Sequence, residues 1–193
     1  FGGGLLAVKD GFRWLGTLET TILQYQLDAP VIHIGPPLGS ASGITSITSV
    51  LMDGGTLKYK GIGQPGAHAM EMTGAWMSDF RNFDIGDVYM PLGSRNSVPW
   101  AGLYCDPTNG TLPFFSVNIT NFRIKHFGWR GISASRDDYG GGGASTQNVF
   151  NNIYISGGSD YGAGTQDISG VGSSGMAVFS GHSQLGLIGF NTE

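Results

Sequence analysis

The chain has 193 residues and a formal net charge of −4 at pH 7, which fits one domain with a sizeable core and provides no basic stripe for nucleic acid. No apolar run approaches the ~20 residues of a membrane-spanning helix, so membrane insertion is not expected. The single cysteine, Cys105, excludes an internal disulfide, and we expect it to point inward as a small buried side chain.

Glycine is abundant and charge is scarce. Gly accounts for 34 residues and charged residues for 12% of the chain, where about 25% charge is ordinary. Gly, Ser, Asn and Thr in place of charged residues suit tight turns rather than helices. The composition therefore favours an all-β chain.

Short alternating segments, separated by Gly- and Pro-rich turns, predict strands along the whole chain. In chain order they lie at 5–8, 12–15, 20–27, 30–35, 44–52, 56–60, 67–72, 79–87, 100–105, within 112–135, and at 148–156, 175–180 and 184–190. Residues 61–66 match the GxGxxG spacing, but Pro65 and the alternation that follows indicate a turn rather than a phosphate-binding helix.

One pattern recurs at 80–87, 119–126 and 150–157. Each copy has an apolar residue, two residues of which the second is Asn, and then an apolar–outward–apolar triplet with the period of a strand. Weaker copies fit at 11–16, 49–54 and 184–187. The six copies give two apolar columns. The first is Phe12, Val50, Phe83, Phe122, Ile153 and Leu185, and the second is Trp14, Met52, Ile85, Ile124, Ile155 and Leu187.

A unit of about 30 residues with one alternating strand cannot bury its apolar side alone, but stacked units can. The sequence therefore predicts one domain over residues 1–193, an all-β, single-stranded parallel β-helix of about six coils. In this register Asp84 and Arg123 are outward neighbours, which we interpret as a structural ion pair. Both chain ends look cut, so we expect the domain to be a piece of a longer polypeptide.

These residues resemble the right-handed parallel β-helix of the pectate-lyase-like superfamily, and especially the shafts of phage tailspikes and polysaccharide depolymerases. The residues that carry the resemblance are the 12–16 segment followed by 21–23 and 30–34, and the stacked Asn82, Asn121 and Asn152. The resemblance covers about residues 5–190, although the acidic Asp-rich entry segment common in that superfamily is missing. It implies binding of a polysaccharide or cell-surface glycan, cleavage by hydrolysis or elimination, a homotrimer, and a place on a virion tail or outside the cell.

A second sheet can be assembled from 31–34, 69–72, 103–106, 132–135 and 176–179. With Ile, Met, Leu and Cys inward, the outward side chains on successive coils are His33, Glu71, Tyr104 with Asp106, Ser133 with Ser135, and Ala177 with Phe179. Adjacent coils lie about 4.8 Å apart, so Glu71 and Asp106 could serve as the two carboxyls of a glycosidase. The alternative interpretation is two solvated carboxylates on an ordinary face.

Eliminative cleavage is a further possibility, with His33 as the base and Lys58 or Arg130 as the cation against a uronate. Aromatic side chains in or beside loops offer flat apolar faces for sugars. With the polar candidates, they give the expected substrate-binding set of His33, Trp100, Tyr104, Trp129, Arg130 and Tyr139. The His and Cys spacing shows no metal-site motif, and no cofactor is expected.

Three functions remain open from the sequence. The first is a carbohydrate-binding β-helix of a viral tailspike or secreted adhesin, with or without polysaccharide-degrading activity. The second is a structural shaft or virion component without a site. The third is an extracellular bacterial polysaccharide lyase or hydrolase.

Overall fold

The computed structural model describes residues 5–7, 9–17, 19–24, 29–35, 46–59, 67–85, 101–105, 115–125, 127, 130–134, 147–156, 177–179 and 185–192. All regular structure in these residues is β-strand, and every pairing between strands is parallel. The all-β prediction is therefore confirmed for the described part of the chain, which contains no helix long enough and apolar enough to cross a membrane.

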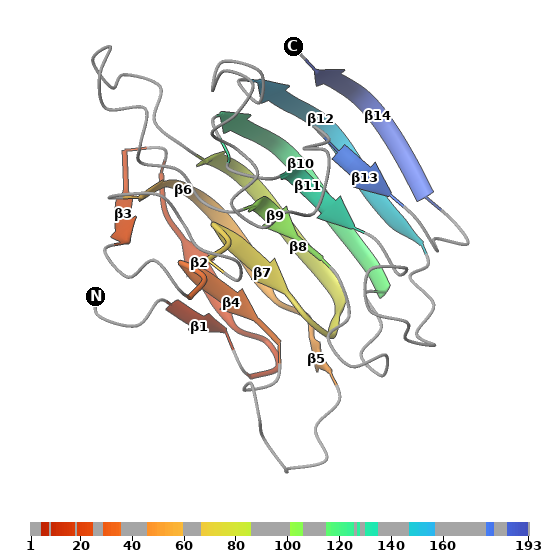
Figure 1. Ribbon diagram of the computed structural model, residues 1–193. Coiled ribbons are helices and arrows are strands. Elements are labelled where there is room, and N and C mark those ends of the chain that lie inside the picture. Colours follow the sequence, from red (N-terminus) through yellow and green to blue (C-terminus); the bar gives the residue numbers. More distant parts are fainter. Residues whose placement is uncertain are drawn as a thin grey trace.

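The strands form two sheets (Figure 1). Sheet A has the order β1 (Leu5–Ala7), β4 (Ile32–Ile34), β7 (Met70–Met72), β9 (Ala101–Tyr104), β11 (Arg130–Ala134) and β13 (Ala177–Phe179). Sheet B has the order β14 (Leu185–Thr192), β12 (Asn148–Ser156), β10 (Phe115–Lys125), β8 (Ala75–Ile85), β6 (Leu51–Tyr59) and β2 (Arg13–Leu15). Two short strands complete sheet B: β3 (Thr21–Gln24) pairs with β6, and β5 (Ile47–Thr48) pairs with β8.

From β6 onward the chain alternates between the sheets, with each new strand beside the previous strand of the same sheet. This order is compatible with a β-solenoid. β1 and β14 lie at opposite ends of the stack, next to the two termini (Figure 1).

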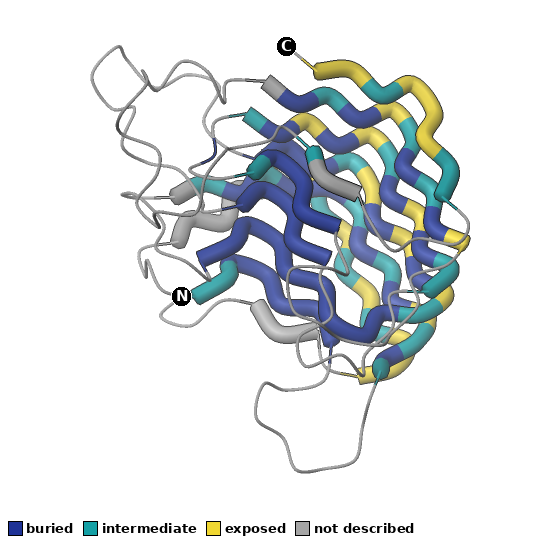
Figure 2. Tube along the Cα trace, turned by 45° about the vertical axis from the view of Figure 1, so that its right-hand side comes forward, coloured by how far each residue is buried: buried dark blue, intermediate teal, exposed yellow. Residues whose placement is uncertain are grey.

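The core lies between the sheets and is made of stacked apolar columns. Ile124 lies opposite both Ile85 and Ile155, and all three side chains are fully buried. The predicted vertical stacking of these isoleucines is confirmed. A second column runs from Met52 through Phe80, Ile119 and Phe150. Figure 2 shows these buried residues in dark blue, alternating with exposed positions along sheet B.

The predicted register of the weaker copies relative to the three regular copies is wrong by five residues. The backbone N–H of Val50 donates to Oγ of Ser78, and Met52 lies opposite Phe80, whereas Phe83 has Gly55 as its upstream partner. Downstream, Phe190 rather than Leu185 lies opposite Ile153.

The reason for this slip is that most coils of sheet B turn twice. Four of the described coils each carry two left-handed residues, five positions apart, and an alternating stretch follows both. The first set is Ser49, Met77, Ser116 and Gln147, and the second is Gly54, Asn82, Asn121 and Asn152. The prediction aligned the first turn of the copies at 11–16 and 49–54 with the second turn of the copies at 80–87, 119–126 and 150–157. A left-handed residue turns the strand without ending its pairing, which is why β8 and β10 are longer than expected.

The predicted register of sheet A holds for four strands. Ile32, Met70, Leu103 and Ile132 form one inward column, and Cys105 is buried as expected. The last strand is shifted by one position from the prediction. Val178 lies opposite Ser133, whereas Ala177 lies opposite Ile132 and continues the inward column.

Candidate functional site

The outer column of sheet A brings together three of the residues predicted for the site. His33, Glu71 and Tyr104 lie opposite one another on β4, β7 and β9. Nδ1 of His33 lies 3.1 Å from Oε2 of Glu71, within hydrogen-bonding distance. The parallel register causes this contact, because it places the outward residue of each sheet A strand beside the outward residue of the neighbouring strand.

These positions were expected at the surface, and the structure corrects that expectation. The exposed fraction is 2% for His33, 6% for Glu71 and 2% for Tyr104. Alternation along a strand shows which side of the sheet a side chain takes, but not whether that side meets solvent. The cluster is therefore a buried polar group and not an open catalytic surface.

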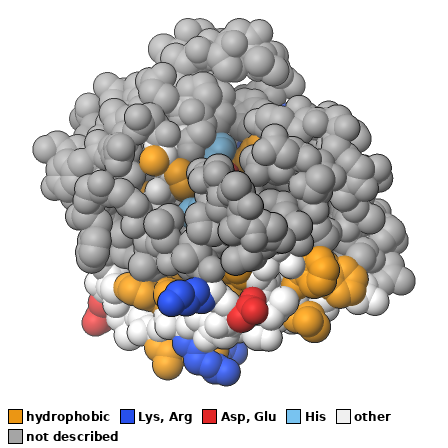
Figure 3. All heavy atoms as spheres, turned by 90° about the horizontal axis from the view of Figure 1, so that it is seen from below, with side chains coloured by type: hydrophobic (Ala, Val, Ile, Leu, Met, Phe, Trp, Pro, Cys, Tyr) orange, Lys and Arg blue, Asp and Glu red, His pale blue; other side chains and the backbone are white. Residues whose placement is uncertain are grey.

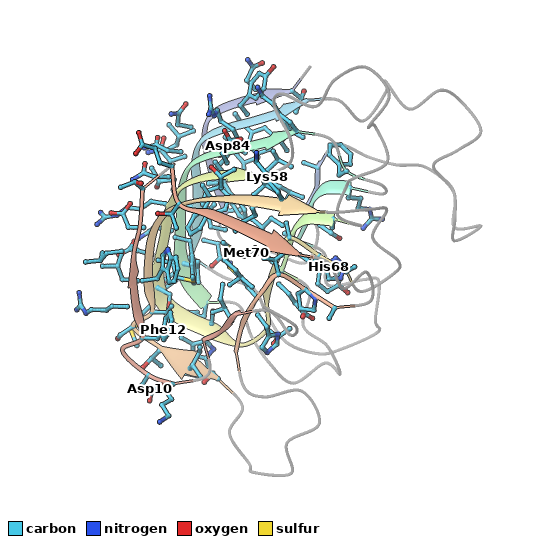
Figure 4. The ribbon with its side chains drawn as sticks, turned by 90° about the vertical axis from the view of Figure 1, so that its left-hand side faces the viewer. Asp10, Phe12, Lys58, His68, Met70 and Asp84 are labelled. Atoms are coloured by element: carbon cyan, nitrogen blue, oxygen red, sulfur yellow. The ribbon has the colours of Figure 1, made fainter. Side chains whose placement is uncertain are left out.

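His68 is a member of this cluster that the sequence analysis did not select. Its ring stacks on Tyr104, with 4.0 Å between the ring centroids and planes 1° apart. Burial lowers the pKa of His68 to about 4, and the negative charge of Glu71 offsets part of this effect. His68 is consequently neutral at pH 7. Figure 4 shows Met70 between the two sheets and His68 further toward the sheet A side. The only signal in the sequence was its place within the strand predicted over residues 67–72, two residues before Met70.

Arg130 lies next to this cluster, because its bonding partner Ser133 is opposite Tyr104 in the outward column of sheet A. Arg130 is half-buried at the start of β11 and donates from Nη1 to Oγ of Ser133, at 2.9 Å. Four predicted site residues lie outside the described residues: Trp100, Asp106, Trp129 and Tyr139. The proposed carboxyl pair of Glu71 and Asp106 thus has no measured separation.

A groove lies on the outer side of sheet B, over the second left-handed turn. It has a volume of about 590 Å³, within the range of small-molecule sites. The residues around it come from the segment after β2 and from β6, β8, β10 and β12. They are Gly16, Thr17, Asp53, Gly54, Asn82, Phe83, Asn121, Phe122, Arg123, Asn152 and Tyr154.

A ladder of side-chain amides crosses the groove. Nδ2 of Asn82 donates to Oδ1 of Asp53 at 2.7 Å, and Nδ2 of Asn121 donates to Oδ1 of Asn82 at 2.9 Å. Nδ2 of Asn152 then donates to Oδ1 of Asn121 at 2.8 Å. Asn suits these positions because it tolerates the left-handed conformation, with φ between 53° and 61° in the three residues.

The charged groups near the ladder form ion pairs. Arg81 donates from Nε to Oδ2 of Asp53 at 2.9 Å, and Arg123 donates from Nη2 to Oδ2 of Asp84. The predicted pairing of Asp84 with Arg123 is confirmed. In the view of Figure 3, basic, acidic and hydrophobic side chains of the described surface lie next to one another, without a large area of one charge.

The aromatic side chain of Tyr154 also borders the groove. Tyr154 lies opposite Arg123 on the neighbouring strand, and its ring is 5.9 Å from Nζ of Lys125. The sequence analysis had named the three stacked asparagines only as part of the resemblance and had not placed a groove there. Within the described ranges, no group of three or more His, Cys, Asp or Glu side chains could hold a metal ion.

Comparison with protein-family models, with curated proteins and with solved structures gave no match.

Proposed function

We propose that this protein is a single-stranded, right-handed parallel β-helix of about six coils that binds a polysaccharide in the groove over the Asn ladder. Support for the β-helix comes from the exclusively parallel ladders and from the alternation between two sheets. The paired left-handed turns, which recur in successive coils, are a further argument for it.

The observation that carries glycan binding is the row of outward-facing amides. An Asn amide has two N–H donors and an oxygen with two lone pairs. In Asn82 and Asn121 the ladder uses one N–H and one lone pair, and so leaves one donor and one acceptor per residue for a ligand. Paired donors and acceptors of this kind suit sugar hydroxyls, which both donate and accept.

The spacing of the amides favours a linear chain of sugars that runs along the stack. Neighbouring amides repeat at the distance between strands, about 4.8 Å, which is close to the length of one pyranose unit in an extended polysaccharide. The ring of Tyr154, half-buried at one side of the groove, offers an apolar face on which a sugar can stack.

The charges favour a neutral polysaccharide over a polyuronate. Arg123, which lines the groove, is paired with Asp84, and the Asp53 carboxylate is shared by Arg81 and Asn82. A uronate would have to compete with Asp84 for Arg123, whereas a neutral sugar needs only the amides and the ring.

Calorimetric titration with a linear neutral β-glucan and with polygalacturonate tests this proposal. We expect the glucan to bind more tightly, and Tyr154→Ala and Asn121→Gly each to weaken its binding about tenfold. Asn118→Ala is the matched control, because Asn118 is an exposed Asn of the same strand that bonds to Asp79 outside the groove. Unchanged affinity in both groove variants would refute the site.

Cleavage of a polysaccharide is a second candidate, which the His33–Glu71 contact favours, because a carboxylate can orient a histidine base. Glu71 belongs to sheet A and the groove to sheet B, so cleavage would take place at a separate site, which would have to open to admit a substrate because His33 and Glu71 are buried. Incubation with polysaccharides should then release reducing ends for hydrolysis, or the absorbance of an unsaturated uronate for elimination. Glu71→Gln should abolish either product, and unchanged turnover would remove Glu71 from the mechanism.

A further inference from the structure

Successive coils of sheet B cross the column of the Asn ladder with the same number of residues. In each strand from β6 to β14, one left-handed residue lies between two positions that pair with the neighbouring strands. The column therefore continues through these strands without an insertion. Its members are Gly54, Asn82, Asn121, Asn152 and Gly189.

The coil that contains β2 and β3 is different, although both of these strands lie beside β6 (Figure 1). Leu15 lies opposite Asp53, and Thr21 lies opposite Thr56. Between these two pairings the β2–β3 coil has residues 16–20, whereas β6 has only residues 54 and 55. This coil thus carries an insertion at the position where the ladder column reaches it.

The inserted residues form a hydrogen-bonded turn at the edge of the groove. The backbone N–H of Thr20 donates to the oxygen of Thr17 at 2.9 Å, and the N–H of Thr17 donates to Oγ1 of Thr20 at 3.3 Å. The N–H of Gly16 donates to the oxygen of Asp53 at 2.6 Å, which holds the turn against β6. Gly16 and Thr17 line the groove, and Thr17 and Glu19 are exposed. The groove therefore ends at a wall on the β2 side.

We propose that the groove binds the end of a polysaccharide chain and not its interior, with the terminal sugar against Gly16 and Thr17. This inference rests on the proposed glycan binding and specifies which part of the glycan is bound. A chain that runs along the stack follows Asn152, Asn121 and Asn82 in turn and then meets the inserted turn. An interior segment needs a groove that is open at both ends, whereas a chain end needs only one open end.

The extent of the groove sets the number of sugar units. Its lining comes from β6, β8, β10 and β12 beside the wall, and these strands repeat at about 4.8 Å. One pyranose unit for each strand gives about four units between the wall and Asn152. Affinity should therefore rise with chain length up to about a tetrasaccharide and then level off.

Binding capacity measured against the number of chain ends tests the inference on the full chain. A long linear β-glucan and a partial hydrolysate of the same glucan differ mainly in the number of chain ends per gram. In calorimetric titrations, the hydrolysate should bind several-fold more protein per gram than the long glucan. Equal capacity per gram would overturn the inference and leave the groove as a binding site, whereas no binding of either glucan would overturn the proposed function as well.

A deletion of residues 17–19 removes the wall. It leaves Gly16 and Thr20 between Leu15 and Thr21, so that the link has the same number of residues as in β6. The long glucan should then bind along its length, and its capacity per gram should rise several-fold. Glu19→Ala is the matched control, because Glu19 is exposed in the same turn but does not line the groove. Unchanged capacity in a deletion variant that circular dichroism shows to be folded would contradict the wall.

End-labelled tetrasaccharides test the same point without altering the protein. One sample carries a bulky label on the reducing end and the other carries it on the non-reducing end. The label on the end that meets the turn should weaken binding at least about tenfold, and the label on the opposite end less than about twofold. Small effects of both labels would overturn the inference, because a groove that is open at both ends tolerates either label.

Discussion

Nδ1 of His33 lies 3.1 Å from Oε2 of Glu71, although 38 residues separate them in the chain. Both side chains are buried, and both occupy the outward column of sheet A. A buried pair of this kind is sensitive to the loss of one partner, because the other group has already lost its contact with water. The burial of these polar side chains on the outward side of sheet A was not expected from the sequence.

Glu71→Ala should lower the free energy of unfolding by about 3 kcal/mol, because it removes the carboxylate that faces the His33 ring. Glu71→Gln should cost less, since its amide oxygen can still accept a hydrogen bond. Urea unfolding measures both. Glu19→Ala is the control: Glu19 is exposed, and we expect a change within about 0.5 kcal/mol. Equal effects of Glu71→Ala and Glu19→Ala would contradict the pairing.

Acid should destabilise the protein through His68. Its pKa in the folded chain is about 4, below the ordinary value of 6.5, so the unfolded chain takes up a proton first as the pH falls. Stability should thus be full above pH 6.5 and decline toward pH 4, by on the order of 3 kcal/mol from this group. His68→Phe keeps an aromatic ring against Tyr104 and should flatten the pH dependence in this window. Unfolding midpoints at pH 7.0, 5.5 and 4.5 measure the slope, and an unchanged slope in the variant would exclude His68 as its origin.

The Asn ladder should contribute to stability in two separable ways. Asn121→Ala loses two side-chain hydrogen bonds and places Ala at a φ of 56°, which should lower stability by about 2–3 kcal/mol in total. Asn121→Gly loses the same bonds but tolerates the backbone conformation, so it should be less destabilising by about 1 kcal/mol. Thermal and urea unfolding would show the order, and a more stable Ala variant would mean that the left-handed turn is not retained in solution.

The isoleucine column should be the most sensitive part of the core. Ile124 is fully buried between Ile85 and Ile155, so Ile124→Ala should cost about 2–5 kcal/mol. Ile188→Ala makes the same chemical change at an exposed position, and in dilute solution it should cost less than about 0.5 kcal/mol. Similar losses in the two variants would argue against a core between the sheets.

The sequence was sufficient to predict strands and their stacking where a short pattern had only one interpretation. The triplets ending in Ile85, Ile124 and Ile155 each follow an Asn and alternate with period two, so both their strands and their stacking could be predicted. The Asp84–Arg123 pair followed from the same register. The earlier copies had two interpretations, because an alternating stretch follows Ser49 as well as Gly54, and the pattern alone could not choose between the two turns.

By itself, then, the sequence determined that the chain is all-β and which side chains point into the core in its most regular coils, because alternation in a strand is a local property. Only the tertiary structure decided that His33, Glu71 and Tyr104 are buried, that His68 stacks on Tyr104, and that the Asn ladder borders a groove. The physical reason is that the exposure of a sheet face depends on which distant segments of the chain pack on it. The sequence of the face itself does not specify those segments.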